Sequence, residues 1–306
     1  MSHNISRRNV LGASLAVGAT AVGTGATSEA ASADESRFHG RGLIGRPHGD
    51  QIHLMTFNIR YEGGDGPPHS WEERRPLVSR VVRRERPTIL YTQEGLYGQL
   101  QDLHDDVYGY DWIHLGRLGG SQSEATAIFW GRRRLKVLEY DHLWLSDNPR
   151  LIASKDWGNN VVRMLTWIRF EDLRTGKEFY AVDNHFDHQS ENARQKGSQM
   201  NADLVSEWDA PVLVGGDFNQ VPGTPTHQIL LDGGLVDTFD EAEEQVTPEY
   251  GTWNGWDPEP STEANRIDWI MATPDVRVVK AGVNTYSDDG LTPSDHWPAQ
   301  ALVSLP

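Results

Sequence analysis

The stretch VLVGGDFNQVP, residues 212–222, takes an apolar run directly into an acidic residue and an amide. Asp217 and Asn219 are two residues apart, so on an extended backbone their side chains would leave from the same face. A carboxylate and an amide in this arrangement can form a plain turn, or they can take part in a metal-assisted reaction. The rest of the sequence has to decide between these possibilities.

Similar polar residues follow other apolar runs of the chain. Taken singly, each is more typical of a turn or a helix cap than of a reaction centre. Loops at strand ends that converge on one edge are, however, where ligands bind in α/β folds. Together the residues therefore indicate one functional site; they are Asn58, Glu94, Asp183 to Asp187, Asp217, Asn219, Asp268, Asp295 and His296.

The elements that must position these residues begin at Gln51. Short β-rich apolar runs predict about ten strands, and amphipathic stretches predict three or four helices, of which one closes at Pro87. This pattern favours a single α/β domain over residues 51–306, with two packed sheets and helices outside them.

The composition limits the class of protein. The chain has 306 residues and no cysteine, so disulfides and thiolate metal sites are excluded. Its formal net charge is −16. Such a charge repels nucleic acid and anionic membranes unless a basic patch or a divalent cation intervenes. Lysine is scarce, and we interpret the acidity as halophilic adaptation. The segments RRERP and GRRRLK are interpreted as solvated faces, without the concentrated basic stripe that duplex DNA requires.

The first 33 residues resemble a twin-arginine (Tat) export signal. Arg7 and Arg8 precede a weakly apolar, glycine-rich run, and ASA at residues 31–33 offers a cleavage site. The run is too short and polar for a stable membrane span. We therefore expect residues 1–33 to be a signal peptide, residues 34–50 a flexible lead-in, and the mature protein to be secreted and monomeric, without stable membrane insertion.

Six segments occur in the order of the endonuclease/exonuclease/phosphatase superfamily, and the match spans residues 52–304. They are MTFNIRY, TQE, DNHFDH, VGGDFNQVP, RIDWIM and SDHWPAQALV. The resemblance implies a four-layer α/β/β/α sandwich, with two mostly antiparallel sheets packed face to face and helices outside. It also implies hydrolysis of phosphate esters, nucleic acid possibly among them, with Mg²⁺ or Mn²⁺ as cofactor.

The resemblance assigns oxygen ligands to the metal. Glu94 matches the family's principal ligand, and Asn58 the neighbouring amide that helps to orient metal and phosphate. Asp217 matches the aspartate that positions or activates the attacking water, and Asp295 matches a further acidic position near the metal. Mg²⁺ prefers such hard oxygen donors.

The resemblance also assigns catalytic and phosphate-binding residues. His296 matches a general base or a phosphate-contacting imidazole, and Asp268 its carboxylate partner. Asn219 matches a donor to the phosphoryl oxygen. His185 matches a second histidine that contacts the phosphate or leaving group, with Glu124 as its carboxylate partner. Arg163 could bind phosphate or pair with a core carboxylate.

Other functions remain open at this stage. HFDH could be a zinc site formed by His185 and His188, although an odd spacing on a strand separates the two side chains. Trp253 and Trp256 could be core residues or an aromatic rim that stacks a base or sugar. The scaffold could be a non-catalytic module that binds phosphate or nucleic acid. Nuclease, small-phosphodiester or inositol-phosphate hydrolase, sugar-phosphate phosphatase and sphingomyelinase-like activities are not separated by the sequence.

Overall fold

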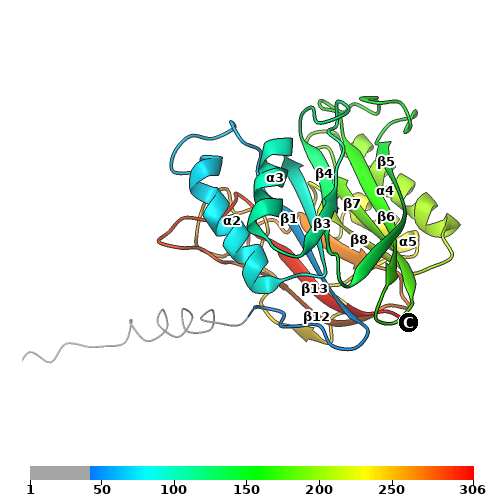
Figure 1. Ribbon diagram of the computed structural model, residues 1–306. Helices are drawn as coiled ribbons and strands as arrows, with labels where there is room; N and C mark the ends of the chain where they lie inside the picture. The colour runs from blue at the N-terminus through cyan, green and yellow to red at the C-terminus, as the bar shows by residue number, and fades with distance from the viewer. Residues whose placement is uncertain (1–41) are drawn as a thin grey trace, which may run out of the picture. The chain divides into compact units, whose positions relative to one another are not determined.

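The computed structural model describes residues 42–306, and the expected signal peptide lies outside them. The described residues form two sheets with helices on the outer faces (Figure 1). One sheet has the order β10-β12-β13-β1-β2-β4-β3 and the other β5-β6-β7-β8-β11-β9. The strands are β1 Gln51–Asn58, β2 Ile89–Gly95, β3 Tyr110–Ile113, β4 Ala125–Gly131, β5 Leu135–Trp144, β6 Met164–Asp172, β7 Glu178–His185, β8 Val212–Asp217, β9 Val236–Asp237, β10 Glu244–Gln245, β11 Asp268–Ala272, β12 Arg277–Val283 and β13 Ala299–Ser304.

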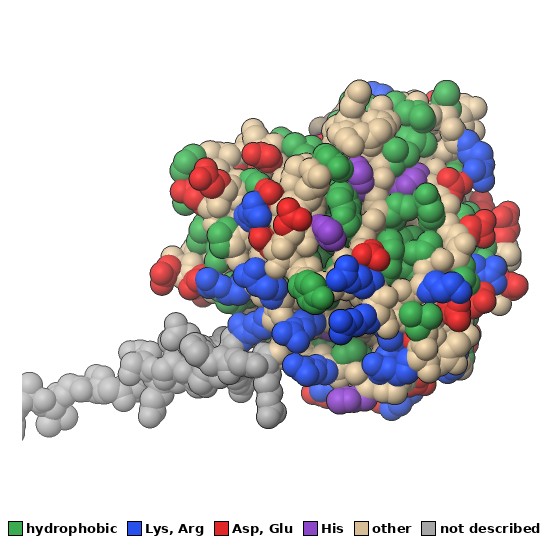
Figure 2. Space-filling model, viewed as in Figure 1, with side chains coloured by type: hydrophobic (Ala, Val, Ile, Leu, Met, Phe, Trp, Pro, Cys, Tyr) green, Lys and Arg blue, Asp and Glu red, His purple; other side chains and the backbone are tan. Residues whose placement is uncertain are grey.

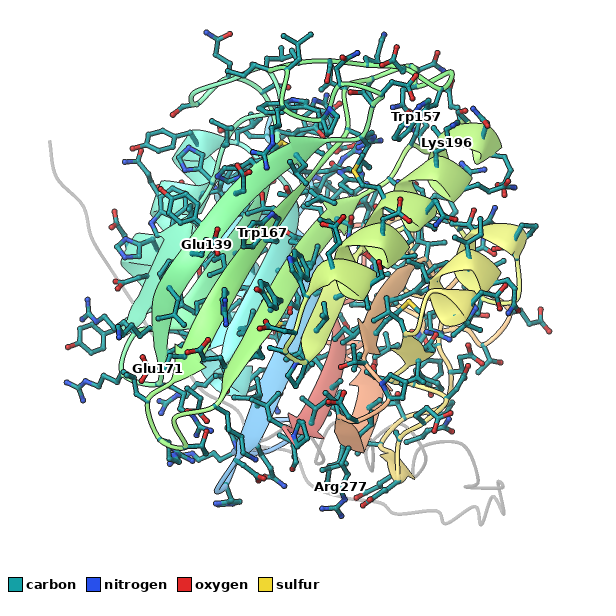
Figure 3. All side chains as sticks on the ribbon, turned by 90° about the vertical axis from the view of Figure 1, so that its right-hand side faces the viewer. Glu139, Trp157, Trp167, Glu171, Lys196 and Arg277 are labelled. Carbon is teal, nitrogen blue, oxygen red and sulfur yellow. The ribbon has the colours of Figure 1, made fainter. Side chains whose placement is uncertain are left out.

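The four described helices cover the two outer faces of the sheets. Helices α2, Trp71–Glu85, and α3, Tyr97–Asp106, lie against the seven-stranded sheet, where Val78, Leu100 and Leu103 pack on Phe57. Helices α4, Glu191–Glu207, and α5, Pro225–Asp232, lie on the six-stranded sheet (Figure 3). A further apolar cluster, with members from both sheets, fills the space between them. The predicted four-layer α/β/β/α sandwich is confirmed.

Most neighbouring strands are antiparallel, but each sheet contains one βαβ unit. Strand β1 pairs with β2 in parallel after the crossover through α2, and β7 pairs with β8 in parallel after α4. Parallel neighbours end at the same edge of a sheet. This arrangement brings the end of β1 beside the end of β2 and the end of β7 beside the end of β8.

Helix α2 begins and ends where local chemistry dictates. The acidic residues Glu72 and Glu73 occupy its first turn and basic residues its last, as the helix dipole favours. Arg86, the residue before Pro87, adopts a left-handed backbone (φ 51°) and donates its N–H to Val82 O. The helix thus stops at the proline that the sequence pattern indicated.

The two glycines before Asp217 bring β8 close to its neighbours. A Cβ at Gly215 would lie 2.4 Å from Cδ2 of Tyr91, whose hydroxyl donates to Leu213 O across the sheets at 3.1 Å. A Cβ at Gly216 would lie 2.3 Å from Asn184 O on β7. The paired glycines therefore allow close packing at the strand that carries Asp217.

We expect Gly215→Ala to destabilise the protein by about 1–3 kcal/mol, because the methyl group must displace the buried ring of Tyr91. Gly98→Ala in α3 is the matched control, since nothing lies within 4 Å of the added Cβ there. That control should be neutral or slightly stabilising. Chemical denaturation of both variants tests the prediction, and equal stability of the two would contradict it.

Candidate active site

Most of the residues predicted from the strand ends meet at one edge of the sandwich. Asn58 is the last residue of β1 and Glu94 lies near the end of β2, whereas His185 and Asp217 end β7 and β8 as a registered pair. Asp268 begins β11 opposite Asp217. Apart from Glu94, which is partly buried, these side chains are buried. The order of the sheets therefore explains why residues far apart in sequence form one site.

The amide of Asn58 joins carboxylates of both sheets. Its Nδ2 donates to Glu94 Oε1 at 3.1 Å and to Asp217 Oδ2 at 3.0 Å. Its oxygen accepts from the backbone N–H of Arg60 at 3.0 Å. Asn58 thus holds the two carboxylates in place with its nitrogen, while its oxygen organises the loop after β1.

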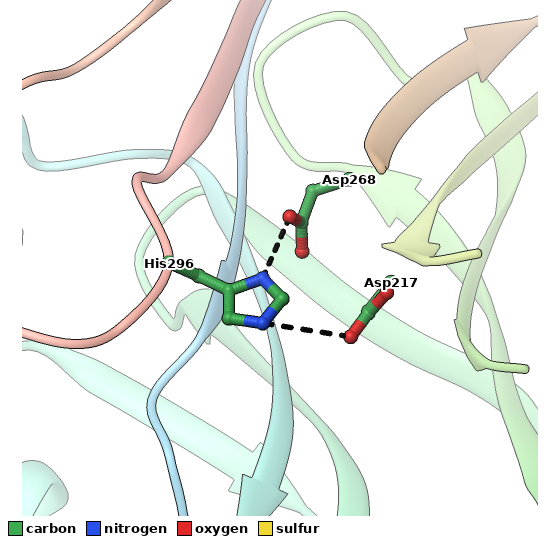
Figure 4. Close-up of side chains that lie close together, drawn as sticks. All are labelled: Asp217, Asp268 and His296. Carbon is green, nitrogen blue, oxygen red and sulfur yellow. Dashed lines mark hydrogen bonds and ion pairs between the residues drawn. The ribbon is translucent and has the colours of Figure 1, made fainter. Parts of the chain in front are cut away.

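Asp217, Asp268 and His296 form a buried cluster (Figure 4). Nδ1 of His296 lies 2.8 Å from Asp268 Oδ2, and Nε2 lies 4.0 Å from Asp217 Oδ2. Oδ1 of Asp268 is buried without a hydrogen-bond partner among the described residues. The three residues place ligand atoms close enough together to hold a metal ion.

The pKa values of Asp217 and His296 are both raised, and the shifts indicate which of the two groups is protonated at neutral pH. Burial and the neighbouring charge of Asp268 raise the pKa of Asp217 to about 7. Burial alone would lower the pKa of His296, but the charge and hydrogen bond of Asp268, together with the charge of Asp217, raise it well above its usual value. His296 therefore carries a proton at neutral pH. Of the two roles predicted for it, this favours the phosphate-contacting imidazole over the general base.

His185 has the opposite environment. Burial and the charge of Arg163 lower the pKa of His185 well below its usual value. Arg163 is itself buried and donates to Nε2 of His185 at 2.7 Å and to Nδ1 of His188 at 3.1 Å. Nε2 of His185 also lies 3.6 Å from Asp217 Oδ2. His185 is therefore neutral beside Asp217, while His296 is charged.

The environment of His185 and His188 argues against the alternative of a zinc site. Strand β7 ends at His185, so the alternation of side chains does not extend to His188. Both imidazoles instead face the guanidinium of Arg163. A fixed positive charge at hydrogen-bond distance opposes a zinc ion at the same place.

Glu124 lies against a different partner from the one predicted. Its carboxylate accepts from Arg117 Nη1 at 2.8 Å and lies 2.5 Å from Nη2 of the same residue. The imidazole of His185, in contrast, is held by Arg163. The structure thus joins Glu124 to Arg117 and does not bring it into hydrogen-bond contact with His185.

The backbone after Asp217 differs from the extended path that the spacing suggested. Strand β8 ends at Asp217, and Asn219 has a left-handed backbone with φ 51°. Its N–H donates to Asp217 Oδ1 at 2.9 Å, and its side chain donates to Phe186 O at 3.0 Å. Asp217 and Asn219 therefore form an Asx turn, so the inference that both leave from one face of a strand was wrong.

Two arginines of the site were missed by the sequence reasoning. Arg60 lies 3.7 Å from Glu94 Oε2 and 3.7 Å from Asp295 Oδ2. Arg74 is fully buried in α2 and donates to the backbone oxygens of Ile59, at 2.9 Å, and Pro293, at 2.9 Å. It thereby ties the loop after β1 to the loop that carries Asp295.

Left-handed backbone is concentrated at the strand ends of the site. Arg60, Glu94 and Asn219 have φ values of 54°, 65° and 51°. This conformation is unfavourable for residues other than glycine, and it persists where surrounding structure enforces it. The hydrogen bonds of Asn58 and Asp217 supply that constraint here.

This fold and site define the class of protein. Residues 55–296 match the model of the Endonuclease/Exonuclease/phosphatase family. The chain belongs to this family, whose members are hydrolases that act on phosphoester bonds.

Solved structures support the assignment. An endonuclease/exonuclease/phosphatase from Bacteroides vulgatus is 29% identical, with a TM-score of 0.79, covering 84% of this chain and 99% of that one. A mannosyl-6-phosphatase from Bacteroides thetaiotaomicron is 28% identical, with a TM-score of 0.78, covering 83% and 100%. The human Nocturnin catalytic domain shares the fold at 17% identity, with a TM-score of 0.66 and coverage of 85% and 97%. No match was found among curated proteins.

We expect Asp217→Asn to change the pH dependence of stability in EDTA. Because folding raises the pKa of Asp217 to about 7, this group makes the parent protein less stable as pH rises from the unfolded-state pKa through 7. Asn219 and Asn58 remain as partners, and the amide does not ionise. The free energy of unfolding of the variant, relative to that of the parent, should therefore increase by about 2 kcal/mol between pH 5 and pH 8. A difference that does not change with pH, measured by chemical denaturation, would contradict the shift.

Proposed function

We propose that the chain is a secreted phosphoesterase that depends on a divalent metal and hydrolyses phosphorylated sugars. The proposal rests on the surroundings of Asp217. Its carboxylate lies between the neutral imidazole of His185 and the charged imidazole of His296, and the buried guanidinium of Arg163 contacts His185. The choice of sugar phosphate is supported by the similarity to a mannosyl-6-phosphatase over its whole length.

The residues at the edge fit a hard divalent cation. Glu94, Asp217 and Asp295 offer carboxylate oxygens beside Asn58, and the guanidinium of Arg60 lies within 4 Å of both Glu94 and Asp295. Three carboxylates face this one guanidinium, so negative charge remains to attract a divalent cation. We assign Mg²⁺ or Mn²⁺ to them, in preference to the Asp217, Asp268 and His296 group, because His296 already uses Asp268 and these ions prefer oxygen ligands. When bound, the ion would neutralise phosphate charge and lower the pKa of water.

The proton transfers follow from the two shifted pKa values. Asp217, with a pKa of about 7, is matched to accepting a proton from the attacking water near neutral pH. His296 holds its proton through Asp268 and can donate a hydrogen bond to a phosphoryl oxygen. Asn219 has one amide hydrogen committed to Phe186 O and one left for the same oxygen.

Phosphate binding is assigned to Arg163 with the help of His188. Nε of Arg163 is buried without a hydrogen-bond partner among the described residues. Buried donors are nearly always satisfied, so this N–H calls for an acceptor such as a phosphate oxygen. A phosphomonoester, with its additional negative charge, suits the concentration of Arg60, Arg163 and charged His296.

An exposed tryptophan next to the site supports a sugar as the esterified group. Trp253 pairs with His296 through an isolated backbone bridge, and its side chain is 49% exposed. Its ring offers an exposed apolar face on the segment that is bridged to His296, with a polar edge for hydrogen bonding. Trp256 instead packs against His69, with ring centroids 4.2 Å apart and the two planes tilted by 35°.

Secretion and a monomeric state belong to the same proposal. The support for export is the sequence of residues 1–33, which lies outside the described part of the chain. No helix among residues 42–306 is long and apolar enough to cross a membrane. Activity is best assayed over a range of KCl concentrations, because its salt dependence tests the halophilic interpretation of the net charge of −16.

The proposed reaction is tested by a substrate panel with Mg²⁺ or Mn²⁺. Hexose 6-phosphates should be hydrolysed faster than bis(p-nitrophenyl) phosphate, inositol phosphates, single-stranded DNA or sphingomyelin, and EDTA should abolish turnover. Asp217→Asn should lower kcat by about 10²–10⁴-fold because the proton acceptor is lost. Asp203→Asn, which alters an exposed carboxylate on α4, is the control and should retain activity. Turnover of DNA alone would replace the proposed substrate, and activity that persists in EDTA would remove the metal from the mechanism.

The role of Arg163 has its own test. Arg163→Lys keeps the charge but loses the planar fork, so we expect KM for the phosphate ester to rise about 10-fold or more, with a smaller change in kcat. Arg169→Lys is the control: Arg169 lies on β6, the strand that begins directly after Arg163, and its side chain pairs with Glu178. Unchanged KM in a folded Arg163→Lys protein would show that Arg163 only supports His185.

A further inference from the structure

Two basic segments that are separate in the sequence form one surface. Gly131 N–H donates to Thr88 O at 3.0 Å, Arg132 N–H to Gly109 O at 3.1 Å, and Leu173 N–H to Arg134 O at 2.9 Å. These bonds join the end of α2, the α3–β3 turn, the β4–β5 turn and the β6–β7 turn. We call the resulting surface the arginine face; it comprises Arg83, Arg86, Arg132, Arg133, Arg134 and Arg174.

The arginine face joins RRERP and GRRRLK, whose arginines are exposed or partly exposed as expected for solvated faces, into one basic surface. Figure 2 shows a band of lysine and arginine side chains across the lower part of the face that carries α2, β3 and β4. The chain has a formal net charge of −16, so this concentration of positive charge is a local reversal. Such a reversal creates a field that attracts anions to one side of the molecule.

Most of these guanidiniums are not neutralised by carboxylates. Arg83 donates to Asp106 O at 3.3 Å and Arg174 to Gly49 O at 3.0 Å, and both acceptors are uncharged backbone oxygens. Arg86 likewise donates to a backbone oxygen, that of Arg83, at 3.2 Å. Arg133 is exposed and forms no hydrogen bond or ion pair with residues 42–306.

Carboxylates do reach two members of the arginine face. Arg134 is tightly paired with the buried Asp172, at 2.5 Å. Arg132 lies 3.9 Å from Asp111, which is a weak exposed contact. The face therefore keeps a net positive charge that is free to meet an external anion.

Exposed apolar side chains lie among the arginines. Tyr108 is 81% exposed and Leu173 is 51% exposed. Both line an open depression of about 420 Å³, together with Gly109, Gly131 and three arginines of the face. The guanidinium of Arg132 lies 5.3 Å from the centre of the Tyr108 ring. Tyrosine, leucine and arginine in this mixture suit the boundary between lipid headgroups and acyl chains.

The arginine face lies at the edge of the sandwich opposite the candidate site. Strand β2 begins at Ile89, next to Thr88, and reaches Glu94 five residues later. This separates the two regions by about 17 Å along the strand. A flat anionic surface bound at the arginine face would leave the candidate site open on the far side, whereas a substrate bound there would not reach Asp217.

We propose that the arginine face docks the protein peripherally on an anionic phospholipid surface. The arginines contact the headgroup phosphates, and Tyr108 and Leu173 enter the headgroup boundary. The contact is electrostatic with a small apolar contribution, and no helix of residues 42–306 is long and apolar enough to cross the bilayer. It would retain a phosphoesterase at a membrane with its candidate site facing the medium.

Vesicle co-sedimentation of the full chain tests the proposal. The protein should bind vesicles of phosphatidylglycerol and phosphatidylcholine in equal parts, bind pure phosphatidylcholine much more weakly, and dissociate as NaCl rises. The triple variant Arg83→Gln, Arg133→Gln, Arg174→Gln should lose about a hundredfold in affinity for the anionic vesicles. Tyr108→Ser with Leu173→Ser should weaken the binding that remains at high salt.

A second triple variant controls for net charge. The variant Arg150→Gln, Lys155→Gln, Lys196→Gln removes the same charge from exposed side chains outside the arginine face; Lys196, for example, lies beside Trp157 in Figure 3. This control should bind like the parent. Equal losses in both triple variants, or no binding of the parent to anionic vesicles, would overturn the proposal. If the parent binds a single-stranded oligonucleotide but not vesicles, and the first triple variant loses that binding, the arginine face would be assigned to nucleic acid instead.

Discussion

The two hydrogen bonds donated by the Asn58 amide hold the candidate site together across the sheets. One acceptor, Glu94, belongs to the seven-stranded sheet, and the other, Asp217, belongs to the six-stranded sheet. Both acceptors are carboxylates, whose mutual repulsion in a buried place would otherwise separate them. An amide with two donors satisfies both at once, and a nearby cation is the natural complement to the charge that remains. The link between the two sheets at this edge and the arrangement of its carboxylates thus depend on the same side chain.

The sequence predicted the layers and the membership of the strand edge well because both depend on local signals. Apolar runs that end in a polar residue mark a strand and its terminus, as at Asn58 and at Asp217. The parallel pairing that brings these termini together needs only two crossover helices, each of which has its own amphipathic pattern. The ordered motifs then supplied the family, and with it the two-sheet sandwich.

The remaining features depend on contacts that no local pattern encodes. The long side chain of Arg60 reaches Glu94 and Asp295 from a loop, and Arg74 crosses from a helix to two loops. The family resemblance predicted Glu124 as the partner of His185, but Arg117, seven residues away, binds its carboxylate. The turn at Asn219 is set by Asp217 accepting its N–H, which a two-residue spacing cannot distinguish from an extended strand. The arginine face escaped notice because its members come from three separate connections of the chain.

Two histidines with similar burial, His185 and His296, have different protonation states, neutral and positively charged, and their neighbours explain the difference. Burial opposes protonation of both rings. At His296 the hydrogen bond and charge of Asp268 overcome that cost, whereas at His185 the nearest charge is the guanidinium of Arg163, which adds to it. Asp217 lies between them, and its own pKa of about 7 leaves it able to accept a proton. Neighbouring groups whose environments separate their pKa values are the arrangement that acid–base chemistry at a phosphate ester requires. The site can therefore hold a donor and an acceptor at the same pH because the two sheets surround Asp217 with charges of different sign.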